Sequence, residues 1–137
     1  MFKRTIKYTD FDGTDREEDF YFHLSKAELV EMEMSKPGGM EKYITKLVQG
    51  LVSEEIIAVF KDMILKSYGE KSDDGKRFIK SSELSKAFSE TEAYSILFYQ
   101  LITDAKLASE FINGLIPADL AKDLEKEEKK KNHPALQ

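Results

Sequence analysis

Apolar and polar residues alternate in two short segments near the amino terminus of the chain. The first, residues 2–8, has one exception on its apolar side, Arg4, and the second spans residues 19–24. Asp12-Gly13 lies between them, and alternation on both sides of an Asp-Gly pair predicts a β-hairpin. Basic residues of the first strand then face acidic residues of the second, so pairs of opposite charge are expected to help set the register. The basic residues are Lys3, Arg4 and Lys7, and the acidic residues are Glu17, Glu18 and Asp19.

From residue 25 onward the apolar residues recur at helical spacing, and the chain is expected to contain about six helices. These helices are expected at residues 25–34, 40–52, 53–68, 81–88, 89–102 and 104–112, the last closed by Asn113-Gly114, and Pro117 suits the first turn of one more. Ser25 and Ser89 each precede an acidic residue by three positions, which is the pattern of a capping box. Residues 70–80 are interpreted as a polar loop that Phe78 and Ile79 hold against the core.

These elements place the protein in the α+β class, predominantly helical, with an N-terminal β-hairpin followed by about six helices. Residues 1–117 are expected to form a single globular domain. Residues 118–137 are dense in charge and are expected to form a frayed or disordered C-terminal tail. A hairpin of two strands is marginally stable alone, so this one must dock on the helices or pair with another subunit.

The composition limits the classes of function that suit such a fold. The chain has 137 residues and a net charge of −5, which argues against nucleic acid as a partner. No apolar run is long enough to span a membrane, and the first ten residues lack the apolar core of a signal peptide. A cytoplasmic location is therefore expected. The chain has no cysteine, which excludes disulfides and thiolate chemistry.

The acidic stretch of residues 9–20 is the first candidate for chemistry, because it holds six carboxylates. Calcium loops of the EF-hand type need an aspartate first, a glycine sixth and a glutamate twelfth. Aligned on Gly13, this pattern places Tyr8 at the first position. Aligned on Gly75, it places Ser81 at the twelfth position. Neither glycine marks a metal site, so the acidic stretch is interpreted as half of a charge-paired hairpin.

A search for catalytic motifs finds no nucleophile elbow, zinc-binding helix or phosphate-binding loop. The two histidines, His23 and His133, lie far apart in the sequence, one in a predicted strand and one in the tail. Adjacent acidic residues such as Glu17 and Glu18 point in opposite directions along a strand and do not form a pair. The protein is therefore expected not to be an enzyme, and to need no metal or cofactor.

Three stretches of the chain resemble small proteins of tailed phages and prophages of Gram-positive bacteria. They are FKRTIKYTDFDGTDREEDFYFHLSKAELVEMEMS, FKDMILKSYGEKSDDGKRFIKSSELSKAFSETEAYSILF and EFINGLIP, which together cover most of residues 2–117. The family is identified as the tail assembly chaperones of long-tailed, non-contractile (siphovirus-type) phages. The charged residues beyond Ala118 correspond to the variable part of such proteins.

The resemblance implies a non-enzymatic role in assembly. Such chaperones coat the hydrophobic tape measure protein in the host cytoplasm, recruit tail tube protein and are absent from the mature virion. Many also exist in a longer, frameshifted form, and the run Lys129-Lys130-Lys131 permits the slippery codons that frameshifting needs. Whether further copies of the chain join in a homo-oligomer stays open.

A partner made of amphipathic helices would need an apolar groove on the chaperone. We expect this groove between the helix of residues 94–102 and the helix of residues 104–112. Its partner-binding residues are expected to be Tyr94, Tyr99, Leu101 and Ile116, and Met32 and Met34 are also expected to be exposed. Tyr21 is a further surface candidate, whereas Phe20, Phe22 and Phe98 are assigned to the core.

Three other functions are compatible with the sequence. The first is a structural phage protein that stays in the particle, such as a connector or a tail completion protein. The second is a small acidic inhibitor or decoy that binds a host protein through its negative surface. The third is an enzyme that works with carboxylates alone.

Overall fold

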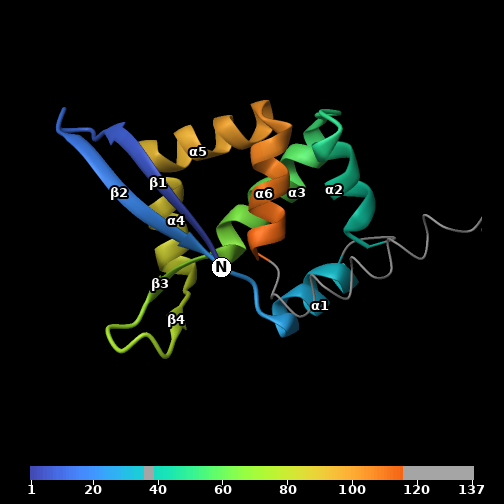
Figure 1. Cartoon of the computed structure of the whole chain (residues 1–137), viewed down its shortest axis with the longest axis horizontal. Coiled ribbons are helices and arrows are strands. Elements are labelled where there is room, and N and C mark those ends of the chain that lie inside the picture. Colours follow the sequence, from blue (N-terminus) through green and yellow to red (C-terminus); the bar gives the residue numbers. More distant parts are fainter. Residues whose placement is uncertain (36–38, 116–137) are drawn as a thin grey trace, which may run out of the picture.

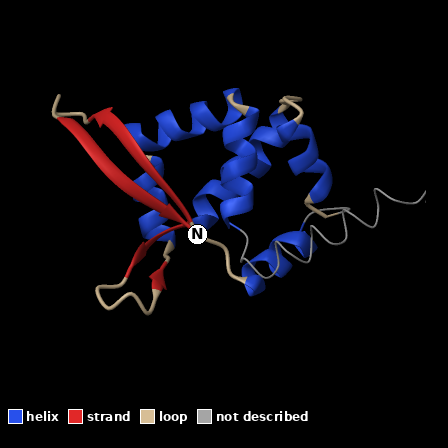
Figure 2. Cartoon of the chain, in the orientation of Figure 1, coloured by secondary structure: helices blue, strands red, loops and turns tan. Residues whose placement is uncertain are grey.

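The fold is described by a computed structural model that covers residues 1–35 and 39–115 (Figure 1). Its strands are β1 (Phe2–Thr9), β2 (Asp15–Phe22), β3 (Tyr68–Lys71) and β4 (Phe78–Ile79), and its helices are α1 (Lys26–Ser35), α2 (Glu41–Val48), α3 (Glu54–Ser67), α4 (Ser82–Ser89), α5 (Glu92–Thr103) and α6 (Ala105–Leu115). Figure 2 shows the strands along one side of the molecule and the helices on the other. The predicted α+β class, mostly helical with an N-terminal hairpin, is confirmed.

The N-terminal hairpin forms as the alternating pattern predicts. β1 and β2 pair antiparallel from Phe2 opposite Phe22 to Thr9 opposite Asp15. The turn between them places Gly13 at a φ of 82°, a backbone conformation that glycine adopts without a steric penalty. The apolar faces of both strands point toward the helices, so the hairpin docks on the helical layer of its own chain.

One expected charge pair forms across this hairpin, and one basic residue has another role. Lys3 Nζ lies 3.5 Å from a carboxylate oxygen of Asp19 on the outer face. Arg4 lies on the inner face, where its Nη2 donates to Gln100 Oε1 of α5 at 3.2 Å. The expectation that Arg4 pairs across the strands is therefore wrong, because the alternation of side chains points it toward the helices.

The interpretation of residues 70–80 as a loop holds for residues 72–77 but is wrong on both sides of them. β3 and β4 form a second hairpin there, and the sheet has the strand order β1-β2-β3-β4. β3 joins β2 through the pairs Tyr21–Gly69 and Phe22–Tyr68. Gly69 is needed at this junction, because a Cβ atom there would lie 2.7 Å from the carbonyl oxygen of Ile79.

The helices differ from the predicted ones by more than one residue at three of their ends. α2 ends at Val48 instead of Val52, because Gly50 adopts a φ of 76° and turns the chain. α5 begins after Thr91, whose hydroxyl accepts the backbone N–H of Tyr94, so Ser89 does not cap it as expected.

The third difference is that α6 continues through Asn113-Gly114 to Leu115. Gly114 does not close the helix. A Cβ atom at Gly114 would lie 3.0 Å from Phe2 Cβ, so the missing side chain lets β1 approach the helix closely. An inter-element contact, which the local sequence does not reveal, accounts for this glycine.

Aromatic side chains hold the hairpin to the helices. Phe22 is fully buried, and its ring contacts those of Phe2, Tyr68, Phe88 and Phe111. The predicted core position of Phe22 is confirmed. Several predicted features lie outside the described residues: the helix expected after Pro117, the tail of residues 118–137 with its His133, and the run Lys129-Lys130-Lys131. Residues 36–38, between the first two predicted helices, lie outside them as well.

Candidate partner-binding site

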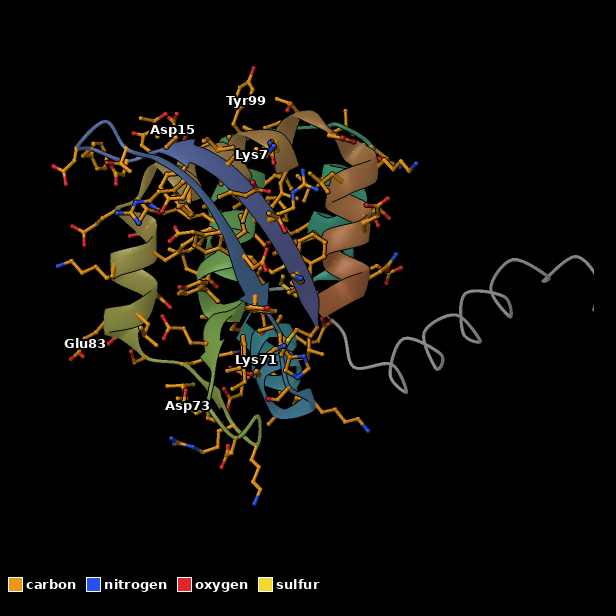
Figure 3. The ribbon with its side chains drawn as sticks, turned by 60° about the vertical axis from the view of Figure 1, so that its left-hand side comes forward. Lys7, Asp15, Lys71, Asp73, Glu83 and Tyr99 are labelled. Atoms are coloured by element: carbon orange, nitrogen blue, oxygen red, sulfur yellow. The ribbon has the colours of Figure 1, made fainter. Side chains whose placement is uncertain are left out.

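Three of the four residues that were expected to bind a partner lie in the described part of the chain, and they differ in exposure. Tyr99 is 66% exposed on α5, and Figure 3 shows its side chain pointing away from the body. Tyr94 is half-buried, with its ring 5.6 Å from that of Phe88 and 6.0 Å from that of Phe98. Leu101 is only 1% exposed, so its expected exposure is wrong. Ile116 lies outside the described residues.

Apolar packing explains the burial of Leu101. An open groove was expected between α5 and α6, but apolar side chains of both helices are buried. These are Leu97 and Leu101 of α5 and Leu107 and Ala108 of α6. Met32 is buried as well, contrary to expectation.

Apolar side chains that do remain open to solvent lie on separate elements of the fold. Met34 is 83% exposed and Val30 is 62% exposed, both on α1. Leu51 and Val52, which follow α2, are also exposed. The turn between β1 and β2 exposes Phe11 in addition.

An open cleft of about 830 Å³ lies between α1 and a wall formed by α3, α4 and the segment that precedes α4. Its residues are Leu24, Glu28, Glu31, Met32, Ser35, Leu65, Lys66, Lys80, Ser81, Ser82, Ser85, Lys86 and Ser89. Leu24, Met32 and Leu65 supply its apolar part. Figure 1 shows α1 set apart from the other helices, at the lower edge of the molecule.

α1 presents one face to this cleft. Glu28, Glu31, Met32 and Ser35 line it, and their spacing of three, four and seven positions places them on the same side of a helix. Val30 lies on the opposite side of the helix, exposed to solvent. α1 therefore has one side turned to the cleft and one apolar side turned to solvent.

The predicted capping box fixes the beginning of α1. The backbone N–H of Ser25 donates to Glu28 Oε1 at 2.9 Å, and the backbone N–H of Glu28 donates to Ser25 Oγ at 3.2 Å. The same carboxylate also accepts two hydrogen bonds from Lys80 Nζ, at 2.8 and 2.9 Å. Glu28 thus caps α1 and connects it to the opposite wall of the cleft.

The charge of Glu28 is stabilised at this position. Partial burial by itself raises the pKa of Glu28, because a buried carboxylate is less hydrated. The hydrogen bonds from Lys80 and Ser25 outweigh burial, and the pKa of Glu28 is lowered overall. The ion pair between α1 and the wall is therefore present at neutral pH.

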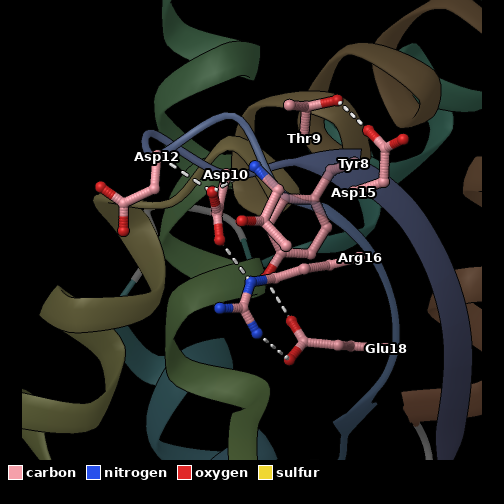
Figure 4. Close-up of polar contacts among 8 residues, drawn as sticks. Tyr8, Thr9, Asp10, Asp12, Asp15, Arg16 and Glu18 are labelled. Atoms are coloured by element: carbon pink, nitrogen blue, oxygen red, sulfur yellow. Dashed lines mark hydrogen bonds and ion pairs between the residues drawn. The ribbon is translucent and has the colours of Figure 1, made fainter.

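The turn of the N-terminal hairpin contains the acidic cluster. Asp10 Oδ1 accepts the backbone N–H groups of Asp12 and Thr14, both at 2.9 Å, and its Oδ2 lies 2.6 Å from Arg16 Nε (Figure 4). The hydrogen bond from Arg16 is the main reason why the pKa of Asp10 is lowered.

The carboxylates near this turn have roles in the hairpin itself. Tyr8 donates to Glu18, and Thr9 donates to Asp15 at 3.0 Å (Figure 4). Across residues 1–35 and 39–115, the histidine, aspartate and glutamate side chains form no group of three suited to hold a metal ion. The acidic stretch stabilises the turn, in agreement with its interpretation as half of a hairpin.

His23 is the remaining candidate for chemistry. Its Nδ1 is buried without a hydrogen-bond partner among the described residues, and its ring packs edge-on against Phe78. Burial lowers the pKa of His23, with smaller contributions from the positive amino terminus and from Lys80. No nucleophile is hydrogen-bonded to this side chain in the described part of the chain, so the geometry does not match that of a catalytic base.

The fold and its open surfaces define the class: a small α+β protein whose accessible features are a charged hairpin, exposed apolar side chains and a cleft of mixed charge. A model of the phage tail assembly chaperone family matches residues 1–137, and the chain belongs to that family. Searches of curated proteins and of solved structures gave no match. None of the helices described here is long and apolar enough to cross a membrane.

Proposed function

We propose that this tail assembly chaperone binds the tape measure protein in the host cytoplasm and keeps it soluble while tail tube protein is recruited. Membership of the family supports a role in tail assembly. The observation that carries the proposal further is the exposure of Val30, Met34 and Tyr99, large apolar side chains that the fold itself does not use. Apolar helices of a partner would cover such side chains and lose their own contact with water.

The charge of the chain suits this role. A net charge of −5 favours solubility. When the chaperone coats an apolar partner, its charged side chains form the surface of the complex. The chaperone acts by binding alone, without a catalytic step. It leaves before the tail is complete, and mass spectrometry of purified particles should therefore not detect it.

Tyr99 stays in the proposed contact surface, whereas Leu101 does not, because it is buried. Tyr94 and Ile116 also stay in the proposed contact surface, and the half-buried Tyr94 contributes the exposed part of its side chain. Tyr99→Asp should leave folding intact, because the side chain is exposed, and should reduce the amount of tape measure protein that co-purifies. Tyr99→Phe is the matched control, since it keeps the apolar ring and removes only the hydroxyl.

The experiment is co-expression of the tape measure protein with the chaperone, followed by measurement of the soluble fraction. The proposal predicts soluble tape measure protein with wild-type chaperone and with Tyr99→Phe, and less with Tyr99→Asp. If wild-type chaperone leaves the tape measure protein insoluble, the proposed function is wrong. If Tyr99→Asp equals wild type, only the placement of Tyr99 is wrong.

A further inference from the structure

We propose that the cleft between α1 and the α3–α4 wall receives one amphipathic helix of the tape measure protein. The flank of that helix next to α1 carries basic side chains, and the flank next to α4 carries acidic ones. This inference rests on the proposed function and adds to it the place of contact and the chemistry of the segment that is bound.

The size of the cleft suits a short helical segment. Its volume of about 830 Å³ lies within the range of sites that enclose a ligand, and is too small for a folded domain. Leu65 and the aliphatic parts of the lysine side chains give it an apolar lining beside the buried Met32. A helix laid between α1 and α4 would place one apolar face on this lining.

The two walls of the cleft carry opposite charges. Glu28 and Glu31 line the α1 side, whereas Lys66, Lys80 and Lys86 line the other side. A bound helix must therefore carry charges opposite to those of each wall.

Some of these charges are already neutralised within the chain. Lys80 is paired with Glu28 at 2.8 Å, and Lys66 lies 3.2 Å from Asp62 on its own helix. Glu31 and Lys86 have no ion-pair partner among the described residues. One unpaired negative charge and one unpaired positive charge thus lie on opposite walls. They favour binding of a helix that has a basic flank and an acidic flank.

Other occupants fit this arrangement less well. A segment with charges of a single sign, including a nucleic acid strand, meets a like charge on one of the two walls. An uncharged apolar helix leaves Glu31 and Lys86 beside an apolar surface, which removes water from them without providing a partner. An amphipathic helix with opposite flanks satisfies both walls.

The test reverses the two open charges separately. Glu31→Lys raises the net charge of the chaperone by two, and Lys86→Glu lowers it by two. A general electrostatic attraction to the tape measure protein would therefore strengthen with one variant and weaken with the other. Contacts on two walls of opposite charge predict that both variants weaken binding, each by about fivefold.

The matched controls reverse exposed charges outside the cleft. Glu110→Lys on α6 makes the same change of charge as Glu31→Lys, and Lys61→Glu on α3 makes the same change as Lys86→Glu. Thermal unfolding of each variant shows whether it is folded, and the amount of co-purified tape measure protein reports binding.

The proposal is supported if both cleft variants retain less tape measure protein than their controls. It is overturned if both bind as wild type does, or if the two variants change binding in opposite directions. Failure of the wild-type chaperone to bind tape measure protein would instead refute the proposed function, so the two failures are distinguishable.

Discussion

Glutamine in place of Glu28 separates the two ways in which this side chain holds α1. A glutamine oxygen still accepts the Ser25 backbone N–H and preserves the capping box, but it carries no charge for Lys80. The Glu28 and Lys80 side chains are 37% and 20% exposed, so solvent weakens their attraction. We expect Glu28→Gln to lower the free energy of unfolding by about 0.5–1 kcal/mol.

Alanine at the same position removes the cap as well. We expect Glu28→Ala to lower the free energy of unfolding by about 1 kcal/mol more than Glu28→Gln. Urea unfolding at neutral pH measures the stability of wild type, Glu28→Gln and Glu28→Ala. The stability of Lys80→Met should match that of Glu28→Gln. The reasoning is refuted if Glu28→Gln and Glu28→Ala have equal stability, because the cap would then contribute nothing.

The dependence on pH gives a further check on this ion pair. The folded pKa of Glu28 is lowered, so its contribution is complete above the usual glutamate pKa of about 4.3. It is lost as the pH falls through the folded pKa. The stability difference between wild type and Glu28→Gln should therefore shrink in acid. A difference that grows below pH 4 would contradict the assigned direction.

Three other changes probe the fold. Gly69→Ala should lower the free energy of unfolding by about 1–3 kcal/mol in urea titrations, because its Cβ would lie 2.7 Å from the Ile79 carbonyl oxygen; unchanged stability would contradict the β3–β4 pairing. Phe22→Ala should lower the free energy of unfolding by about 3–5 kcal/mol, since the ring is fully buried. If Phe22→Ala lost less stability than Tyr99→Ala, whose side chain is exposed, the described core would be wrong. Because burial lowers the pKa of His23, stability should fall as the pH drops below about 6.5. In thermal melts, His23→Gln should make the dependence of stability on pH less steep. An unchanged dependence would contradict the assigned role of His23.

Much of the fold follows from local signals in the sequence. The Asp-Gly turn and the alternation beside it are sufficient to predict β1 and β2, because both depend on nearby residues. The cap at Ser25 forms as expected, and Ser53 and Ser81 cap their helices in the same way, since a cap needs only a side chain and a backbone N–H three positions away. Thr91 caps α5 through the same local chemistry, but Ser89, two positions earlier, also matches the pattern of a cap and led to the wrong predicted start.

The remaining features depend on contacts between distant residues. β3 and β4 are short, and β3 joins the sheet through Gly69 opposite Tyr21, a pairing that no local pattern reveals. The two sides of the cleft are joined by Lys80 and Glu28, a contact across 52 positions of the sequence. Leu101 was expected to be exposed but is buried. The prediction failed because the width of an apolar stripe on a helix does not show how much of the stripe another helix covers.

Hydrogen exchange of the chaperone, free and in complex with co-expressed tape measure protein, tests the central claim most directly. The account predicts slower exchange in the complex for the backbone amides of α1 and α4, which form the two sides of the cleft. The turn at residues 10–14 lies outside the cleft and should exchange at the same rate in both states. Unchanged exchange in α1 and α4, with protection elsewhere, would contradict the claim that the cleft holds the partner.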